Sequence, residues 1–317
     1  MSVKKIMVIG FGTVGQGFFE MLRAKGKLSP FSGAKIAEIV DMKIGHIREP
    51  GPNVIDEIKG GKRFQQKDVV EAIKESDADI VCEFTWVNFK DAEPAHKHMI
   101  AALQNGKDVI TTNKGPIALR YGELMAEAAK RGLQVKFKGT VMASTPSFNI
   151  TRLIPGAEVT GIRGIMNGTT NYILARMAEG MAFSAALKEA QEKGYAEADP
   201  TNDIDGYDAA AKAAILSNVF GWGHTMSSIS VKGIRDVTPE EAANGTKLLV
   251  KVDAKQASVS PEKLQDSDIL RHVNGVMNAI EISTDTLGKI YSLGPGAGKS
   301  ETAQAAMSDL AEILNEN

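Results

Sequence analysis

The sequence predicts an α/β protein with two domains: a doubly wound parallel sheet over residues 1–137 and a second, α+β domain over residues 138–299. The chain has 317 residues, and typical domains hold about 150 residues each. Short apolar segments alternate with helical segments up to about residue 137, the order that places helices on both faces of a parallel sheet. Beyond that point short strand-like segments mix with longer helices, which is typical of an α+β domain.

The first predicted element is a buried strand at residues 6–9, Ile-Met-Val-Ile, followed at once by glycines. A continuous apolar run suits a parallel strand because helices cover both of its faces. Apolar residues then recur at helical spacing from Val14 until Gly26, so strand, tight turn and helix follow one another.

Further elements follow the same reasoning. In the first domain we expect strands at residues 36–40, 79–82, 108–111 and 133–137 and helices at residues 95–104 and 121–131. In the second domain we expect strands at residues 158–166 and 279–284 and helices at residues 185–193 and 208–219. The last helix, within about residues 300–317, is expected to return to the first domain.

Composition favours a small-molecule partner. The formal net charge is −2, which offers no positive field for nucleic acid or an anionic membrane. The single cysteine, Cys82, cannot form an intrachain disulfide, as expected in a reducing compartment. The sequence contains no run of 18 apolar residues that would predict a membrane span, and its N-terminus matches a secretory signal only poorly. We therefore expect a cytoplasmic protein.

The glycine turn after the first strand predicts a Rossmann-type dinucleotide site. It fits G-x-G-x-x-G and opens a helix, where free N–H groups and the helix dipole suit a pyrophosphate. An ordinary glycine-rich turn is the alternative. The candidate cofactor-binding residues are Gly10, Phe11, Gly12, Thr13, Val14 and Gly15.

Asp41, at the end of the second strand, could accept hydrogen bonds from the ribose hydroxyls of NAD. Its charge would repel the 2′-phosphate of NADP, whereas nearby Lys43 and Arg48 could offset that repulsion. The cofactor is therefore NAD or NADP, and the preference stays open. Asp41 could also be a simple turn residue.

Residues 194–208 hold five acidic side chains with no base among them. Crowded carboxylates are unfavourable unless a cation or an amine-bearing ligand meets them. A solvated acidic loop is the alternative.

The helix that follows carries Asp208 and Lys212, four residues apart, on the same face as Ile215, Leu216 and Val219. An ordinary surface pair would more often lie on the polar side of a helix. This placement predicts a partly desolvated lysine held by a carboxylate, which suits a proton donor.

Seven segments together resemble homoserine dehydrogenases, in the order found in that family and over nearly the whole chain. They are Gly10–Gly15, Thr111–Pro116, Asn167–Tyr172, Gly194–Asp203, Gly206–Lys212, Val231–Ile234 and Gly294–Gly298. The resemblance implies reversible, NAD(P)-dependent interconversion of L-aspartate 4-semialdehyde and L-homoserine, a step towards threonine, methionine and isoleucine. It also implies a homodimer formed through the second domain, which is the substrate-binding and dimerisation domain.

The resemblance also implies roles for individual residues. Lys212 matches the proton donor, Asp208 its acidic partner, and Lys114 a lysine near the nicotinamide and the substrate; either lysine could transfer the proton. The positions that match the substrate pocket are Glu197, Asp203, Tyr195, Gly168 and Thr169. Thr85 matches a residue beside the cofactor, and the turn with Gly296 and Gly298 is expected to close over the nicotinamide half.

Two features depart from the family's pattern. Lys138 stands where relatives often use a glutamate to hold a monovalent cation, so we expect no sodium ion through that side chain and assign no metal ligands. The chain ends at Asn317, so we expect neither a C-terminal regulatory domain nor threonine feedback through one. His96 and His98 are interpreted as surface or capping residues rather than metal ligands.

Two other functions remain open. A related two-domain NAD(P)-dependent amino-acid or semialdehyde dehydrogenase would share the glycine turn but lack the set Glu197, Asp203, Asp208 and Lys212. A non-catalytic NAD(P)-binding sensor would bind the cofactor without turnover.

Overall fold

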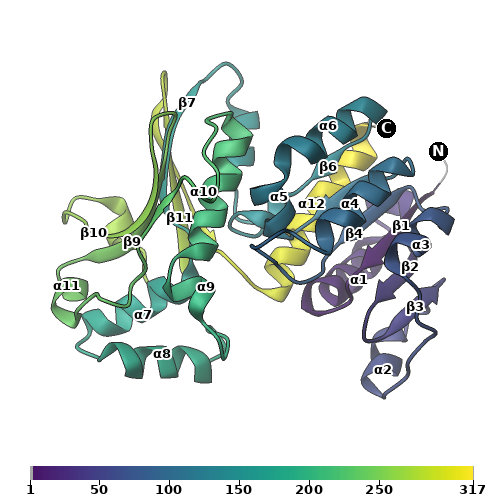
Figure 1. Ribbon diagram of the computed structural model, residues 1–317, viewed down its shortest axis with the longest axis horizontal. Coiled ribbons are helices and arrows are strands. Elements are labelled where there is room, and N and C mark those ends of the chain that lie inside the picture. Colours follow the sequence, from purple (N-terminus) through teal and green to yellow (C-terminus); the bar gives the residue numbers. More distant parts are fainter. Residues whose placement is uncertain (1–2, 317) are drawn as a thin grey trace. The chain divides into compact units, whose positions relative to one another are not determined.

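The computed structural model describes residues 3–316 and divides the chain into two compact units (Figure 1). The N-terminal unit runs to Ser144 and takes up the chain again from Gly298, and the second unit comprises Thr145–Ala297. Each unit is built around its own six-stranded sheet.

The sheet of the N-terminal unit has the strand order β3-β2-β1-β4-β5-β6. All neighbouring strands are parallel except β2 and β3, which are antiparallel. This confirms the predicted doubly wound sheet. The strands are β1 (Lys4–Ile9), β2 (Ala34–Asp41), β3 (Gly45–Arg48), β4 (Ile80–Glu83), β5 (Asp108–Thr111) and β6 (Val135–Lys136).

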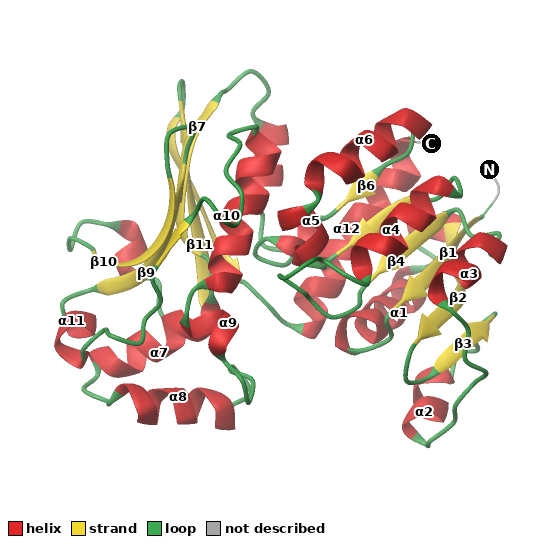
Figure 2. Ribbon diagram, in the orientation of Figure 1, coloured by secondary structure: helices red, strands yellow, loops and turns green. Residues whose placement is uncertain are grey.

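Helices lie on both faces of this sheet (Figure 2). They are α1 (Thr13–Lys25), α2 (Val54–Lys59), α3 (Val69–Glu75), α4 (Ala95–Gln104), α5 (Lys114–Leu119), α6 (Tyr121–Arg131) and α12 (Lys299–Glu316). Successive side chains of a strand point to opposite faces, and on β1 both sets are buried. Ile6 and Val8 share one core with Phe18 of α1 and Leu310 of α12. The last helix therefore completes the core beneath the glycine turn.

The second unit holds a sheet of order β12-β11-β7-β9-β10-β8, antiparallel apart from the short pair β10 and β8. This confirms the predicted α+β fold of this part of the chain. The strands are β7 (Val159–Ile165), β8 (Ser230–Val231), β9 (Thr246–Val252), β10 (Ala257–Lys263), β11 (Met277–Thr284) and β12 (Gly288–Pro295).

Two helices of this unit position the candidate substrate residues. Helix α10 (Tyr207–Phe220) packs on β9 and β10, and α7 (Gly168–Ala178) contacts β9 and β11. The remaining helices are α8 (Phe183–Glu192), α9 (Thr201–Ile204) and α11 (Pro239–Ala243). Because alanines occupy much of α10, the helix can approach the sheet closely and carries Lys212 into the interior.

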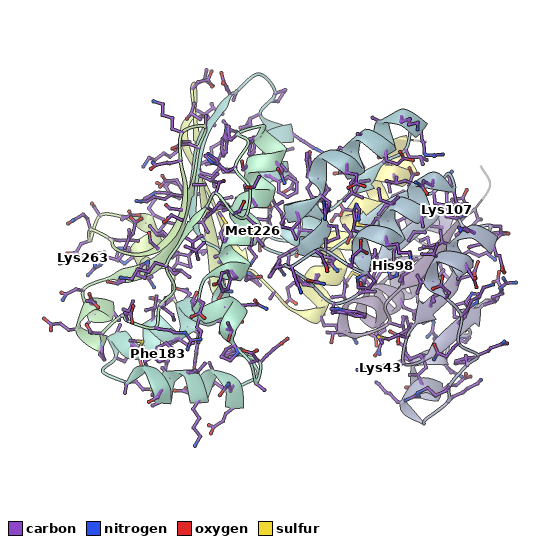
Figure 3. The ribbon with its side chains drawn as sticks, in the orientation of Figure 1. Lys43, His98, Lys107, Phe183, Met226 and Lys263 are labelled. Carbon is purple, nitrogen blue, oxygen red and sulfur yellow. The ribbon has the colours of Figure 1, made fainter. Side chains whose placement is uncertain are left out.

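The interpretation of His98 as a surface or capping residue is wrong. His98 lies on α4 inside the N-terminal unit (Figure 3), is 6% exposed, and has Nδ1 3.5 Å from Oε1 of the buried Glu83. Its neighbour two residues earlier, His96, is also mostly shielded and lies beside Glu93 and Glu123. Burial beside a carboxylate was not visible from the helical spacing alone.

Candidate active site

The glycine turn joins β1 to α1 and is tied to β2. The Gly10 N–H donates to the Val40 carbonyl at 2.9 Å, and the Phe11 N–H donates to Oδ2 of Asp41 at 2.9 Å. The Phe11 side chain is buried in the core and packs edge-on against Phe19. The backbone of the turn is therefore available to bind a ligand, while the buried Phe11 ring fixes the turn to the core.

The shape of this turn fits a dinucleotide. A Cβ on Gly15 would lie 2.3 Å from the Gly10 carbonyl oxygen, and a Cβ on Gly10 would lie 2.8 Å from the Phe84 backbone. By contrast, nothing lies within 4 Å of a Cβ built on Gly12, and no side chain caps the N-terminus of α1. Two glycines thus allow close packing of the turn, and the third leaves room for a pyrophosphate beside free helical N–H groups.

Asp41 acts as a turn residue, because its carboxylate accepts three backbone N–H groups. Oδ1 accepts the N–H groups of Lys43 at 2.8 Å and Ile44 at 3.2 Å, and Oδ2 accepts that of Phe11. The carboxylate therefore organises the turn after β2 and the glycine turn together. It lies at the carboxyl end of β2, where a Rossmann-type sheet binds the adenosine ribose.

Thr85 and Lys114 follow the carboxyl ends of β4 and β5. The Thr85 hydroxyl donates to Oε1 of Glu83, and its carbonyl accepts from the side chain of Asn113 at 3.2 Å. Asn113 also caps α5 by accepting the Gly115 N–H at 3.1 Å. Because Lys114 is the first residue of that helix, the cap fixes the point from which its side chain extends.

In the second unit, Lys212 and Asp208 form a shielded ion pair on α10. The Lys212 ammonium lies 2.8 Å from Oδ2 of Asp208 and also donates to the Met166 carbonyl at the end of β7. Lys212 is only 6% exposed. An ammonium has three N–H bonds, so the contacts among the described residues leave one for a further acceptor.

Asn167 joins this pair to Asp203, a link that sequence reasoning missed. Its Nδ2 donates to Oδ1 of Asp203 at 2.6 Å and to Oδ2 of Asp208 at 2.9 Å. Its Oδ1 accepts the Thr170 N–H at 2.9 Å and so caps α7. The available signal was an asparagine directly before a helix, a typical N-cap, but the two carboxylates that it bridges are far away in sequence.

Three other candidate substrate residues, Gly168, Thr169 and Tyr195, lie around the start of α7. The Thr169 hydroxyl donates to the Tyr195 carbonyl at 2.6 Å, and the rings of Tyr195 and Tyr172 lie 4.9 Å apart. Gly168 begins α7 so close to Val276 that a Cβ would lie 2.6 Å from its carbonyl oxygen. Glu197 is exposed, in the segment between α8 and α9.

The acidic segment is not uniform. Asp205 forms an ion pair with Arg235, and Asp199 accepts the Thr201 N–H at the start of α9. These two carboxylates have structural partners of their own. Asp203 and Asp208 instead both accept hydrogen bonds from Asn167. Only these two of the five carboxylates are therefore linked to Lys212 by the contacts described here.

The second glycine turn follows β12, with Gly296 in the second unit and Gly298 opening the N-terminal unit's last helix. The Thr145 hydroxyl donates to the Pro295 carbonyl at 2.9 Å. Gly298 has a φ of 138°, a conformation that favours glycine.

The Lys138 ammonium forms an ion pair with Glu312 of α12. The backbone N–H of Lys138 donates to Oδ2 of Asp309 at 2.9 Å. Burial raises the pKa of Asp309 to about 8, against the opposing effect of the nearby Lys138. The Lys138 ammonium is therefore engaged by a carboxylate of its own unit.

Within residues 3–316, the structure holds no group of three or more His, Cys, Asp or Glu side chains placed to bind a metal. No helix of that range is both long and apolar enough to span a membrane.

Comparison with known proteins identifies the family. The model of the homoserine dehydrogenase NAD-binding domain matches residues 10–138, and the model described as homoserine dehydrogenase matches residues 146–311. The homoserine dehydrogenase of Sulfurisphaera tokodaii is 39% identical over 96% of this chain and 97% of its own length. The NAD(+)-dependent homoserine dehydrogenase of Pseudomonas canavaninivorans is 33% identical over 99% of this chain and 97% of its own length.

A solved structure shows the same fold throughout. A hyperthermophilic archaeal homoserine dehydrogenase in complex with NADPH superimposes with a TM-score of 0.88 at 31% identity, covering 100% of this chain and 99% of that one. Together with the glycine turn and the Lys212 pair, these matches show that the chain belongs to the homoserine dehydrogenase family of NAD(P)-dependent oxidoreductases.

Proposed function

We propose that Lys212 is the proton donor in the NAD(P)-dependent interconversion of L-aspartate 4-semialdehyde and L-homoserine that this chain catalyses. The observation that carries the proposal is the shielded Lys212–Asp208 pair, 2.8 Å apart, in which the contacts with residues 3–316 leave one N–H of the lysine for a further acceptor. When bound, the nicotinamide would supply a hydride to the aldehyde carbon or accept one from the alcohol. Lys212 then has the charge and the proton that an alkoxide oxygen needs.

Asp208 and the Met166 carbonyl hold the ammonium in place. They accept two of its N–H bonds and fix the direction of the third. A shielded setting strengthens an electrostatic interaction with developing negative charge, since little water screens it. In the reverse direction the same nitrogen, once neutral, would take the hydroxyl proton of homoserine. Lys114 is the second candidate for this transfer.

Glu197 and Asp203 are proposed to neutralise the ammonium group of the substrate. Asp203 is half-buried, and its Oδ1 accepts a hydrogen bond from the neutral amide of Asn167 at 2.6 Å. The negative charge of this carboxylate suits the ammonium group of the substrate. Tyr195, Gly168 and Thr169 form the wall next to these carboxylates, as their contacts around the start of α7 suggest.

The cofactor is proposed to bind through the backbone of residues 10–15, with Asp41 at the ribose, Thr85 and Lys114 near the nicotinamide, and Gly296 and Gly298 closing over that half. The open side of Gly12 supports the pyrophosphate position. Both NAD and NADP remain candidates: Asp41 favours NAD, while Lys43 and Arg48 are available to a 2′-phosphate.

Residues 1–137 with the last helix form the NAD(P)-binding domain, and residues 138–299 bind the substrate and form a homodimer. The small-molecule substrate, rather than nucleic acid or a membrane, is the partner, as the net charge of −2 suggests. The location is cytoplasmic, which the single buried Cys82 supports.

One assay tests the function. Nicotinamide absorbance is followed with L-homoserine and, separately, with 4-hydroxybutyrate, which keeps the hydroxyl but lacks the amino group, each with NAD and with NADP. Reduction of the cofactor with homoserine, and little with 4-hydroxybutyrate, is the expected result. Cofactor binding without turnover would instead identify a sensor, and equal turnover of 4-hydroxybutyrate would identify a related dehydrogenase that does not recognise the amino group.

A further inference from the structure

Asn278 of β11 has a buried amide without a partner. The residue is 1% exposed, and neither Oδ1 nor Nδ2 forms a hydrogen bond with any residue that the structure describes. Burying an amide without hydrogen bonds is unfavourable, and buried polar side chains are therefore nearly always paired. The proposed mechanism does not use this side chain, so its position needs another reason.

The register of the sheet places Asn278 between the two parts of the candidate site in this unit. Its partner on β12 is Gly294, where the second glycine turn begins. On the other side, the pairing of Ala279 with Ile165 makes Met166 the next neighbour of Asn278. The Met166 carbonyl accepts a hydrogen bond from Lys212. Asn278 thus lies in one row with the anchor of the lysine and the start of the turn.

The turn passes directly over the amide. A Cβ on Gly296 would lie 2.0 Å from Nδ2 and 2.5 Å from Oδ1 of Asn278. The turn is also held by Thr145, whose hydroxyl donates to the Pro295 carbonyl at 2.9 Å. Only glycine allows the backbone to come this near, so the absent side chain of Gly296 brings backbone N–H and C=O groups within reach of a donor and an acceptor.

We propose that Asn278 is a positioning residue for the turn of residues 294–297, an inference that rests on the proposed function of that turn at the nicotinamide. When the turn settles on the cofactor, the Asn278 amide donates to one backbone carbonyl of the turn and accepts one backbone N–H. Without cofactor the amide stays unpaired. The free energy gained by pairing it is then available only in the bound state, so it strengthens cofactor binding.

A positioning role for Asn278 has a consequence that a purely structural role would not have. Asn278→Leu replaces the amide by an apolar group of similar size. The cofactor-free variant should keep or exceed the wild-type melting temperature, because two unpaired polar groups are removed. Its Kd for NADPH should rise at least about tenfold, a change of about 1.4 kcal/mol, and its KM for the cofactor should rise while KM for homoserine stays unchanged.

Two controls sharpen the test. ADP-ribose lacks the nicotinamide ring, so its affinity should be the same in Asn278→Leu and wild type. Ile282→Val changes a buried residue on the same face of β11; it should lower the melting temperature without changing the Kd for NADPH. If Asn278→Leu does not fold, Asn278→Ala removes the same amide and should show the same selective loss.

An unchanged Kd for NADPH in a folded Asn278 variant overturns the inference, and so does an equal loss of ADP-ribose affinity. Failure of the proposed function looks different: the wild-type protein would not oxidise homoserine at all, whatever the variants bind.

Discussion

The Lys212 ammonium lies 2.8 Å from Oδ2 of Asp208, one helical turn away on α10, in a position where only 6% of the lysine is exposed. Exposed pairs at this spacing contribute only a few tenths of a kcal/mol. A shielded pair is different, because removal of one partner leaves an uncompensated charge. Asn167 extends the pair to Asp203 and so connects the proposed proton donor with the proposed ammonium site.

Asn167→Ala should affect both stability and catalysis. It removes the cap of α7, which costs about 1 kcal/mol of unfolding free energy, and it removes the donor shared by Asp203 and Asp208. We expect a lower kcat and a KM for homoserine raised by about tenfold, or about 1.4 kcal/mol. Steady-state kinetics and thermal unfolding measure the two effects.

The matched control for this variant is Asp68→Ala. Asp68 caps α3 of the N-terminal unit by accepting the Glu71 N–H at 3.0 Å. It should lose a similar amount of stability with unchanged kinetic constants. Equal kinetic effects of the two variants would show that Asn167 acts only as a cap.

Glu197→Gln should raise KM for homoserine more than it lowers kcat, since a neutral amide no longer compensates the substrate's ammonium group. The control is Asp205→Asn in the same acidic segment, because Asp205 is paired with Arg235. Initial rates over a range of homoserine concentrations separate the effect on KM from the effect on kcat in each variant. An unchanged KM in Glu197→Gln would remove that residue from the substrate pocket.

Asp41→Ser should shift the cofactor preference towards NADP. The change removes a negative charge from the proposed ribose site while leaving Lys43 and Arg48 in place. We expect the ratio of kcat/KM for NADP to that for NAD to rise about tenfold, or about 1.4 kcal/mol. Because Asp41 also organises the glycine turn, both cofactors should bind somewhat more weakly; an unaltered ratio would count against a role in discrimination.

The main elements could be predicted because their signals are local. Helices α4 and α6 begin and end at the predicted residues, since each has a clear apolar face. Strand β3 was not predicted: its four residues, Gly-His-Ile-Arg, are short and mostly polar, and it forms only by pairing with β2. Four strands of the second sheet, β8, β9, β10 and β12, were also not predicted, because lysine, serine and proline interrupt their apolar pattern.

In the site, too, contacts within one helix could be predicted, whereas contacts between segments distant in sequence could not. The spacing of Asp208 and Lys212 on one helix predicts their contact directly. Asn167 and Asn278 owe their positions to neighbours that are distant in sequence, at Asp203, Asp208 and Gly296. No periodicity or motif contains that information, since these contacts form only when the helices and strands have packed together.

Asp309→Asn should change the pH dependence of stability. The pKa of Asp309 is raised to about 8 in the folded protein, chiefly by burial, from an ordinary value of 3.8. Between these two values the folded state binds a proton that the unfolded state releases. The free energy of unfolding therefore falls as pH rises, by up to about 1.4 kcal/mol per pH unit from this group.

Asparagine cannot ionise, yet it keeps an oxygen that can accept the Lys138 N–H. The variant should consequently gain stability relative to wild type as pH increases from 5 to 8. Thermal midpoints of both proteins across this range provide the measurement. Parallel pH profiles would show that Asp309 is not protonated in the folded protein.

The rate of Lys212→Met tests the central claim most directly. Methionine keeps much of the side-chain length but carries no proton, so kcat for homoserine oxidation should fall by about 10²- to 10⁴-fold, while the Kd for NADPH stays at the wild-type value. Lys188→Met, at an exposed position of the same unit, should leave both constants unchanged. A Lys212→Met enzyme with near wild-type kcat would contradict the assignment of Lys212 as the proton donor.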